Sequence, residues 1–291
     1  MTGASGGLSS ALSPALMKQK HQIIATDIVT SEDPLPNFEM MDVRDWNQVK
    51  SCIDQHRPDW VMHLAAETDV DKCEVEPEHS YKTNTIGTEN IAMACAHFSV
   101  PLVYISTGGV FNGNKREPYT EYDLPDPVSV YARSKLEGEK IVQSLLKKYF
   151  IFRAGWMVGG GKKDKKFVAK IVRLLQTQKE IKAVSDKFGT PTFVWDMANL
   201  IIQVIQTERY GIYHAVNHGM TTRYEIAKKI VELLGKKDVQ VHPVSSSVFP
   251  LPAPRAVSEA MVNYKLNLLG LNTMPPWEES LALYLKSQKE F

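Results

Sequence analysis

The chain has 291 residues, of which 43% are hydrophobic and 23% are charged, and its formal net charge is +1. This balance is typical of a soluble protein with one large or two modest domains, and it excludes a global field that would recruit nucleic acid or an anionic membrane. No apolar run approaches the roughly 18 residues that span a bilayer, and no secretory signal is visible. Three widely spaced cysteines without metal-ligand spacing predict reduced thiols, a cytoplasmic protein and no metal site.

The N-terminal residues, MTGASGGLSSA, place Gly3 and Gly6 at the spacing of a dinucleotide-binding turn. Glycines let the backbone approach a pyrophosphate, whose charge then meets the N–H groups of the next helix, here expected over Ser10–Met17. Ser9 stands at the third glycine position, and the strand that should precede the turn is nearly absent. We therefore expect a truncated or misassigned start; a flexible Gly/Ser terminus is the alternative.

A β-rich run, His21–Asp27, ends in an acid roughly 20 residues past the turn, where a carboxylate can bind the adenosine ribose. No Lys or Arg follows directly to receive a 2′-phosphate, which favours NAD(H) over NADP(H). A turn cap is the alternative role for Asp27. A helix is predicted over Trp46–Gln55, and the apolar run Trp60–Ala66 predicts a buried parallel strand. Ala65 and Ala66, at the end of this run, are small enough for a cofactor to lie against the backbone; simple close packing is the alternative.

A helix is predicted over Tyr81–Phe98, with Asn84 inside it, and a buried strand over Val100–Thr107. The hydroxyls of Ser106 and Thr107 end that strand, where open α/β sheets bind ligands. After a polar loop, the run Val130–Glu139 places Tyr131 and Lys135 one helical turn apart on one face. A nearby ammonium stabilises a phenolate, so we expect Lys135 to lower the tyrosine pKa and make Tyr131 a general acid or base; an ordinary surface pair is the alternative.

Strands and helices alternate along the first half of the chain, which predicts an α/β fold with a Rossmann-type doubly wound parallel sheet and a smaller C-terminal α/β substrate lobe. The predicted division assigns residues 1–152 and 184–217 to the dinucleotide-binding domain, and residues 153–183 and 218–291 to the substrate lobe. The lysine-rich stretch Lys162–Lys166 is interpreted as a solvated loop, with contact to a substrate pyrophosphate as the alternative.

Together these pieces resemble the extended short-chain dehydrogenase/reductases, and within them the dTDP-4-dehydrorhamnose reductase family. The resemblance covers nearly the whole chain and rests on ordered motifs: Thr2-Gly3-x-x-Gly6, Ala65-Ala66 with Thr68, Asn84-x-x-Gly87-Thr88, Ser106-Thr107 with Val110-Phe111-x-Gly113, Tyr131-x-x-x-Lys135, Arg153-x-x-Trp156, Asp186-x-x-Gly189-x-Pro191-Thr192, Gly211-x-Tyr213-His214 and Pro254-Arg255.

The resemblance implies reduction of the 4-keto group of a nucleotide-activated deoxysugar by NADH or NADPH, with NADH favoured. Tyr131 would protonate the keto oxygen, Lys135 would bind the nicotinamide ribose, and Thr107 would hold the oxygen. Substrate contacts are predicted at Thr68, Thr107, Trp156 and Arg255. Cofactor contacts are predicted at Gly3, Ser5, Gly6, Leu8, Asp27, Asp42, Val43, Ala65, Ala66, Asn84, Tyr131 and Lys135. The expected partner is the nucleotide sugar, and a homodimer is left open.

One departure concerns the two residues after Thr107, where the family usually has an aspartate and then a tyrosine. Here they are Gly108 and Gly109, which cannot do the acid/base work of the Asp-Glu pair of 4,6-dehydratases. Two alternatives to a reductase stay open. One is a non-catalytic dinucleotide-binding partner protein, similar to the regulatory subunit of methionine adenosyltransferase. The other is a nucleotide-sugar epimerase.

Overall fold

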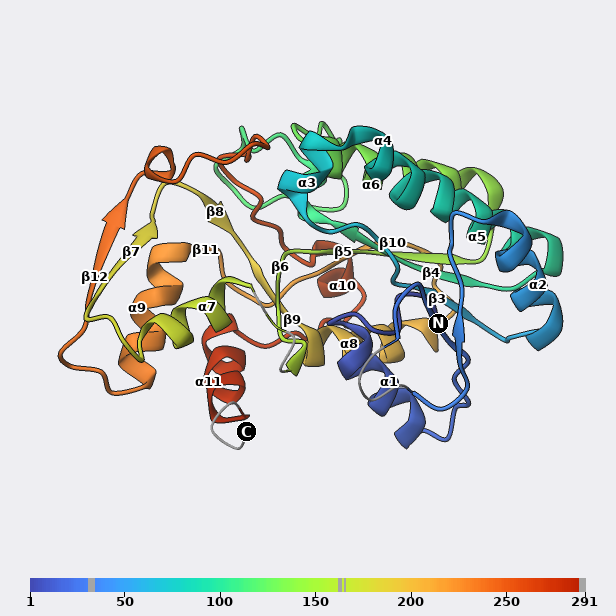
Figure 1. Ribbon diagram of the computed structural model, residues 1–291, viewed down its shortest axis with the longest axis horizontal. Coiled ribbons are helices and arrows are strands. Elements are labelled where there is room, and N and C mark those ends of the chain that lie inside the picture. The colour runs from blue at the N-terminus through green and yellow to red at the C-terminus, as the bar shows by residue number, and fades with distance from the viewer. Residues whose placement is uncertain (31–34, 162–163, 165, 288–291) are drawn as a thin grey trace.

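A parallel sheet forms the centre of the computed structural model, which describes residues 1–30, 35–161, 164 and 166–287 (Figure 1). Four strands pair in the order β10, β5, β4, β3, with bounds Gly211–Ala215, Tyr149–Ala154, Leu102–Thr107 and Val61–His63. Strands β1 (Ala25–Asp27) and β2 (Phe38–Met40) form a second parallel pair. Thr2 joins the two groups through parallel bridges to Thr26 and His63, so a single residue holds the central strand position.

Helices cover both faces of this sheet, which confirms the predicted doubly wound α/β fold (Figure 1). One face carries α2 (Trp46–His56), α5 (Gly87–Phe98) and α6 (Val130–Leu145). The other carries α1 (Ser9–Lys18) and α8 (Val194–Ile205). Each layer has its own buried apolar cluster against the strands, because the strand side chains alternate between the two faces.

Two predicted elements differ from the structure. The strand expected over Trp60–Ala66 is shorter in the structure, where β3 covers only Val61–His63. On one side β3 pairs with the single residue Thr2, so little of the expected strand has a partner there. The helix expected over Tyr81–Phe98 is interrupted by a π-helical turn, η1 (Lys82–Ile86), between α4 (Pro77–Tyr81) and α5. Such π turns occur mostly as single insertions in α-helices and are frequent at functional sites. A short helix, α3 (Val70–Val75), precedes α4.

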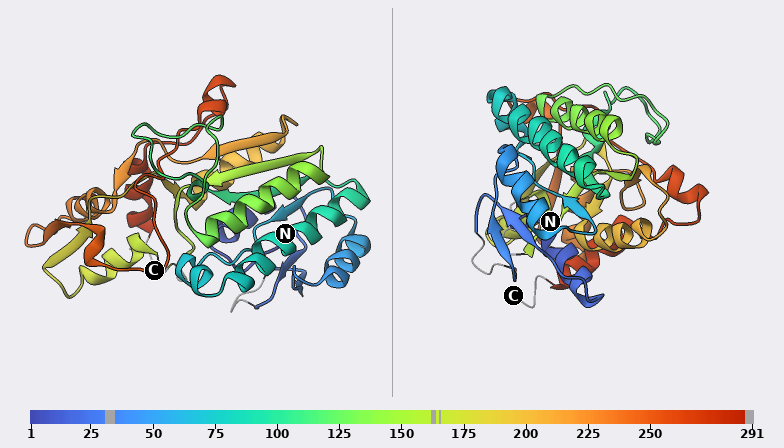
Figure 2. Two further views of the ribbon diagram at one scale, coloured as in Figure 1. Left: turned by 90° about the horizontal axis from the view of Figure 1, so that it is seen from above. Right: turned by 90° about the vertical axis from the view of Figure 1, so that its right-hand side faces the viewer.

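A second group of elements lies beside one end of the sheet (Figure 2). Its strands β7 (Glu180–Val184) and β12 (Gln240–Val244) pair in parallel. Helices α7, α9 and α11 share a separate apolar core with them, with bounds Phe167–Leu174, Arg223–Leu233 and Trp277–Ser287. The described residues also form shorter elements: β6 (Trp156–Val158), β8 (Phe188–Gly189), β9 (Pro191–Phe193), β11 (Thr221–Thr222), α10 (Tyr264–Leu268), η2 (Gly108–Val110) and η4 (Ser246–Val248). The domain boundaries given above stay a prediction.

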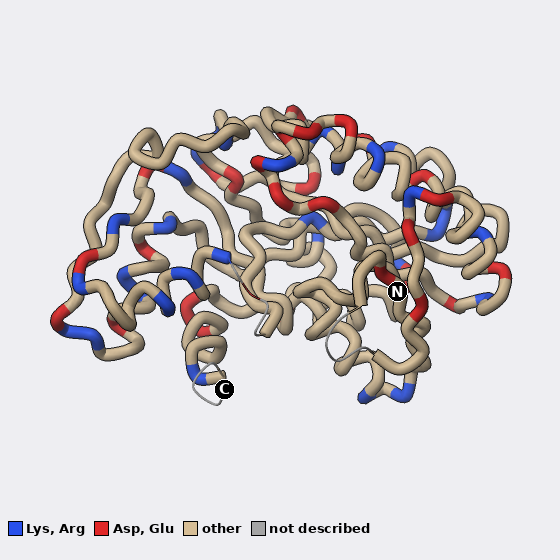
Figure 3. Tube along the Cα trace, in the orientation of Figure 1, with Lys and Arg blue, Asp and Glu red and all other residues tan. Residues whose placement is uncertain are grey.

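Basic and acidic residues are interspersed over both groups of elements (Figure 3). Within the part of the chain that the structure describes, no helix has the length and apolar character needed to cross a membrane.

Candidate active site

A cavity of about 850 Å³ opens at the carboxyl ends of the central strands, facing the second group of elements. This is the edge at which open α/β sheets bind ligands. Its walls combine the glycine turn, the ends of β1, β3 and β4, the first turns of α6, and residues from β6, α9 and the segment before α10. The cavity therefore spans from the expected dinucleotide site to the expected substrate side.

The glycine turn fits close approach of a ligand to the backbone. Gly3 has φ +67°, and a Cβ there would lie 2.6 Å from the backbone nitrogen of Ala65, so only glycine is accommodated. Gly6, Gly7 and Leu8 line the cavity where α1 begins, and free N–H groups at a helix start favour phosphate. Ser9, at the third glycine position, instead directs its hydroxyl to Ser13 at 3.0 Å. The chemistry of this turn fits a dinucleotide pyrophosphate.

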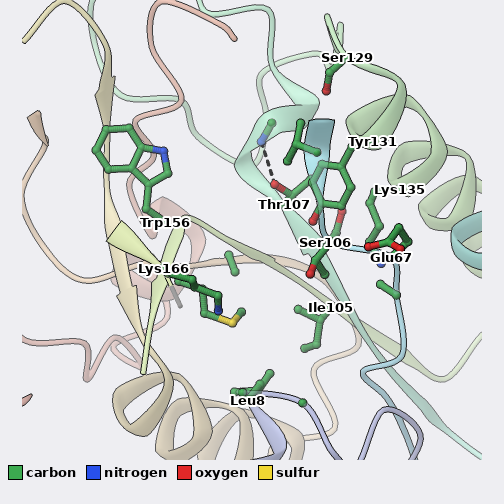
Figure 4. A pocket seen from close by; sticks show the side chains of 18 of the residues that line it. Leu8, Glu67, Ile105, Ser106, Thr107, Ser129, Tyr131, Lys135, Trp156 and Lys166 are labelled. Atoms are coloured by element: carbon green, nitrogen blue, oxygen red, sulfur yellow. Dashed lines mark hydrogen bonds between the residues drawn. The ribbon is translucent and has the colours of Figure 1, made fainter. Parts of the chain in front are cut away.

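A lysine ammonium, that of Lys166, also lies beside the glycine turn. The lysine-rich stretch Lys162–Lys166 has Lys162, Lys163 and Lys165 outside the described residues, but Lys166 is placed and lines the cavity (Figure 4). Its ammonium would lie 3.8 Å from a Cβ at Gly7. Burial lowers the Lys166 pKa, and Asp164 opposes that effect. Lys166 is therefore positioned to meet phosphate oxygens on the cofactor side of the cavity.

Asp27 and Asp42 line the part of the cavity where the adenosine end of the dinucleotide is expected. The Asp27 carboxylate accepts the N–H groups of Ser5 at 2.9 Å and Ile28 at 2.7 Å, so it ties the end of β1 to the glycine turn. Asp42 is paired with Arg44, whose Nη2 lies 2.6 Å from Oδ2, and this bond lowers the Asp42 pKa. Asp27, Asp42, Val43 and Arg44 all line the cavity, whereas Ser5 acts through its contact with Asp27. Sequence reasoning missed Arg44 as a cavity residue.

Thr107, Tyr131 and Lys135 lie next to one another at the cavity (Figure 4). Thr107 ends β4, and Tyr131 and Lys135 project from the first turns of α6. Ser129 caps that helix by accepting the N–H of Ala132 at 3.3 Å, which fixes where its first turn begins. Helical periodicity then carries Lys135 to the same face as Tyr131.

Tyr104, from β4, supports the lysine of this group. The Lys135 ammonium lies 4.1 Å from the centroid of the Tyr104 ring, and the Tyr104 hydroxyl donates to the Lys135 carbonyl at 3.2 Å. An ammonium over a buried aromatic face gains electrostatic stabilisation from the ring quadrupole. Tyr104 therefore favours the charged form of Lys135.

Burial is the largest cause of the pKa shifts of Tyr131 and Lys135. It raises the pKa of Tyr131 well above its usual range, with the Thr107 hydroxyl acting in the opposite direction. It lowers the pKa of Lys135 to about 7, which the Glu139 carboxylate opposes. The sequence led us to expect a tyrosine pKa lowered by the lysine, but the main effect on Tyr131 is desolvation, which raises its pKa. A neutral phenol at neutral pH is suited to donate a proton rather than to accept one.

Asn84 lies beneath this site rather than in the cavity wall. It is fully buried in the π turn, where its Oδ1 accepts the Glu67 N–H at 2.9 Å. Its Nδ2 donates to the Glu67 carbonyl at 3.1 Å and to the Ser134 hydroxyl at 3.0 Å. The π turn thus aims Asn84 at both the loop after β3 and helix α6. This contact connects the part of the cavity wall that contains Ala65, Ala66 and Thr68 to the helix of Tyr131.

The substrate side of the cavity gathers residues from distant segments. Trp156 lines it, and its Nε1 donates to Glu259 Oε2 at 3.1 Å. The Arg223 guanidinium lies 4.0 Å from the centroid of the Trp156 ring, and burial lowers its pKa to about 10. Arg255, also in the wall, pairs with Asp71 at 3.0 Å. Arg223, Lys187 and Glu259 were missed from the sequence, because no local pattern distinguishes them from surface charges.

A family model described as "RmlD substrate binding domain" matches residues 1–290. The chain belongs to the dTDP-4-dehydrorhamnose reductase family. It is 33% identical over 290 residues to the dTDP-4-dehydrorhamnose reductase of Mycobacterium tuberculosis, covering 98% of this chain and 91% of that relative. It is 31% identical to the spore coat polysaccharide biosynthesis protein SpsK of Bacillus subtilis, covering 99% of this chain and 96% of the relative.

Solved structures of the family resemble this one over almost its full length. A dTDP-4-dehydrorhamnose reductase from Clostridium acetobutylicum has a TM-score of 0.91 and 35% identity, covering 99% of this chain and 98% of that one. One from Bacillus anthracis, solved in complex with NADP, has a TM-score of 0.90 and 36% identity, covering 98% and 97%. The family predicted from the motifs is therefore confirmed.

Proposed function

We propose that this protein reduces the 4-keto group of a nucleotide-activated deoxysugar with a nicotinamide dinucleotide as reductant. The observation that carries this proposal is the grouping of Thr107, Tyr131 and Lys135 at one cavity that also contains the glycine turn. Relatives named dTDP-4-dehydrorhamnose reductase and dTDP-4-keto-6-deoxy-D-glucose reductase support the substrate class.

The protein's own residues would orient the sugar and move one proton. When bound, the reduced nicotinamide supplies the hydride that adds to the carbonyl carbon. The Thr107 hydroxyl donates a hydrogen bond to the keto oxygen and polarises the carbonyl. Tyr131 would give its phenol proton to that oxygen, so that the product is an alcohol. Lys135 would bind the ribose hydroxyls of the dinucleotide and would stabilise the phenolate until solvent returns the proton.

For the cofactor we propose NADH in preference to NADPH. Asp27 lines the cavity where the adenosine ribose would lie, and its negative charge disfavours a 2′-phosphate. The NADP complex of the Bacillus anthracis relative and the position of Arg44 in the same wall are the observations in favour of NADPH. Titration of the two reduced cofactors by fluorescence compares them directly, and an Asp27→Asn variant should gain relative affinity for NADPH.

The decisive experiment is Tyr131→Phe, with turnover of a dTDP-4-keto-6-deoxy sugar followed by loss of NAD(P)H absorbance. Removal of a general acid should lower kcat by about 10²–10⁴-fold, with cofactor affinity little changed. Tyr122→Phe, at an exposed tyrosine, is the control. Normal turnover by Tyr131→Phe would refute the mechanism.

The alternative of a non-catalytic partner protein is supported by Gly108 and Gly109, which replace side chains that the family usually has. It predicts dinucleotide binding without turnover by the wild-type chain, together with a stoichiometric partner on purification. Inversion of a nucleotide sugar without net cofactor consumption would instead indicate the epimerase.

A further inference from the structure

A distant segment, residues 259–261, packs against Gly108 and Gly109. A Cβ at Gly108 would lie 2.7 Å from Met261 Cε and 3.2 Å from the Glu259 carbonyl oxygen. A Cβ at Gly109 would lie 3.4 Å from Thr107 Oγ1 and 3.8 Å from Glu259 Oε1. Gly108 therefore leaves room for the Met261 side chain, whereas Gly109 faces both the Thr107 hydroxyl and the Glu259 carboxylate.

The Glu259 carboxylate lies beside the proposed catalytic hydroxyls. It lines the same cavity, and its negative charge is close enough to Tyr131 to raise the tyrosine pKa. Its Oε2 accepts the Trp156 indole N–H, while Oε1 accepts no hydrogen bond from any residue that the structure describes. Attraction between Glu259 and the nearby Arg223 opposes the lowering of the Arg223 pKa. One oxygen of a held carboxylate thus remains available to a ligand.

The backbone around Glu259 is held on both sides. Its N–H donates to the Phe188 carbonyl in β8 at 2.8 Å, and the next carbonyl, of Ala260, accepts the Tyr119 N–H at 2.8 Å. The Met261 N–H donates to the Thr190 hydroxyl at 3.4 Å. A binding group gains specificity when its scaffold fixes its position before the ligand arrives.

An ionised carboxylate has only acceptor oxygens, so Glu259 cannot bind the keto oxygen. It can accept a hydrogen bond from a hydroxyl, and the position shared with Thr107 Oγ1 puts it within reach of the same sugar ring. We propose that Glu259 Oε1 binds the ring hydroxyl next to the reacting 4-keto group, which makes Glu259 a specificity-determining residue. This inference rests on the proposed function and narrows it to sugars with a free hydroxyl beside the carbonyl.

The test compares two substrates, dTDP-4-keto-6-deoxyglucose and its 3-deoxy analogue, with wild type, Glu259→Ala and Glu259→Gln. Glu259→Ala removes a charged hydrogen-bond acceptor, so its kcat/KM for the hydroxylated sugar should be about 10- to 100-fold lower than that of wild type. The 3-deoxy analogue should be turned over within about threefold of wild type by Glu259→Ala. Glu259→Gln keeps an acceptor oxygen, so its kcat/KM for the hydroxylated sugar should lie between those of wild type and Glu259→Ala. Glu137→Gln, at an exposed side chain on α6, is the control.

Two outcomes would overturn the proposal. Equal losses on both sugars would mean that Glu259 acts only by holding Trp156, and equal kcat/KM for wild type and Glu259→Ala would mean that it has no role. Binding of the same two sugars, measured by calorimetry without cofactor, separates this inference from the reductase proposal. Selective binding that Glu259→Ala abolishes supports the hydroxyl contact even if wild type shows no turnover; binding without selectivity refutes it.

Discussion

Glu139→Gln should strongly destabilise the protein, because it breaks a buried ion pair below the proposed active site. Glu139 follows Lys135 by one turn of α6, and its two oxygens accept Arg153 Nε at 2.9 Å and Nη2 at 2.7 Å. The side chains of Glu139 and Arg153 are 0% and 4% exposed. Arg153 Nη1 has no hydrogen-bond partner among the described residues, so the guanidinium depends on this carboxylate for compensation of its charge.

Removing one charge of such a pair leaves the other buried and unpaired, which costs about 3–5 kcal/mol of unfolding free energy. For a chain of this size that loss corresponds to a fall in Tm of about 5–8 °C. Urea unfolding followed by circular dichroism measures the loss directly. On the same helix, Glu137→Gln breaks an exposed pair with Lys140, whose side chains are 44% and 60% exposed, and should cost at most about 0.5 kcal/mol.

The double variant Glu139→Leu, Arg153→Met completes the argument, because replacing both charges by apolar groups removes the uncompensated guanidinium. It should recover most of the stability that Glu139→Gln loses. If Glu139→Gln unfolds within about 1 kcal/mol of wild type, the reasoning from burial and bidentate geometry is wrong. If the double variant is no more stable than Glu139→Gln, the destabilisation comes from packing rather than from charge.

Three further predictions follow from the glycine turn, the lysine and the buried histidines. Gly3→Ala should abolish dinucleotide binding, because at a φ of +67° its Cβ would lie 2.6 Å from the backbone nitrogen of Ala65. The control, Gly235→Ala, has a φ of +63° but nothing within 4 Å of its Cβ, so it should bind the dinucleotide normally. Equal binding by the two variants would contradict the steric argument. The kcat/KM for reduction should fall as pH rises through about 7, the pKa of Lys135, since a neutral amine no longer stabilises the phenolate; a flat profile from pH 6 to 9 excludes this role. Burial lowers the pKa of His63 and of His214 to about 3, below the usual 6.5, so the unfolded chain binds more protons between these values. Stability should therefore fall as pH drops below 6.5, by roughly 1 kcal/mol per pH unit for each imidazole, and an unchanged urea midpoint at pH 4.5 would refute this.

Local patterns in the sequence were sufficient for much of the fold and for the centre of the site. The apolar runs that became β4 and β5 and the periodicity of α6 predicted a doubly wound sheet, and helical geometry alone placed Tyr131 and Lys135 on one face. Thr107 could be placed at the cavity because it ends a buried strand, and parallel strands end at a common edge. These features depend on residues at most a few turns apart.

Only the tertiary structure decided the rest of the cavity. Glu259 and Arg223 meet Trp156 from segments that share no periodicity with it, and their charges look like solvated surface in the sequence. The reversal of the expected Tyr131 pKa has a similar origin, because desolvation depends on every segment packed around the phenol rather than on its neighbour in the helix. Secondary structure follows from local periodicity, whereas burial and the meeting of distant side chains exist only once the chain has folded.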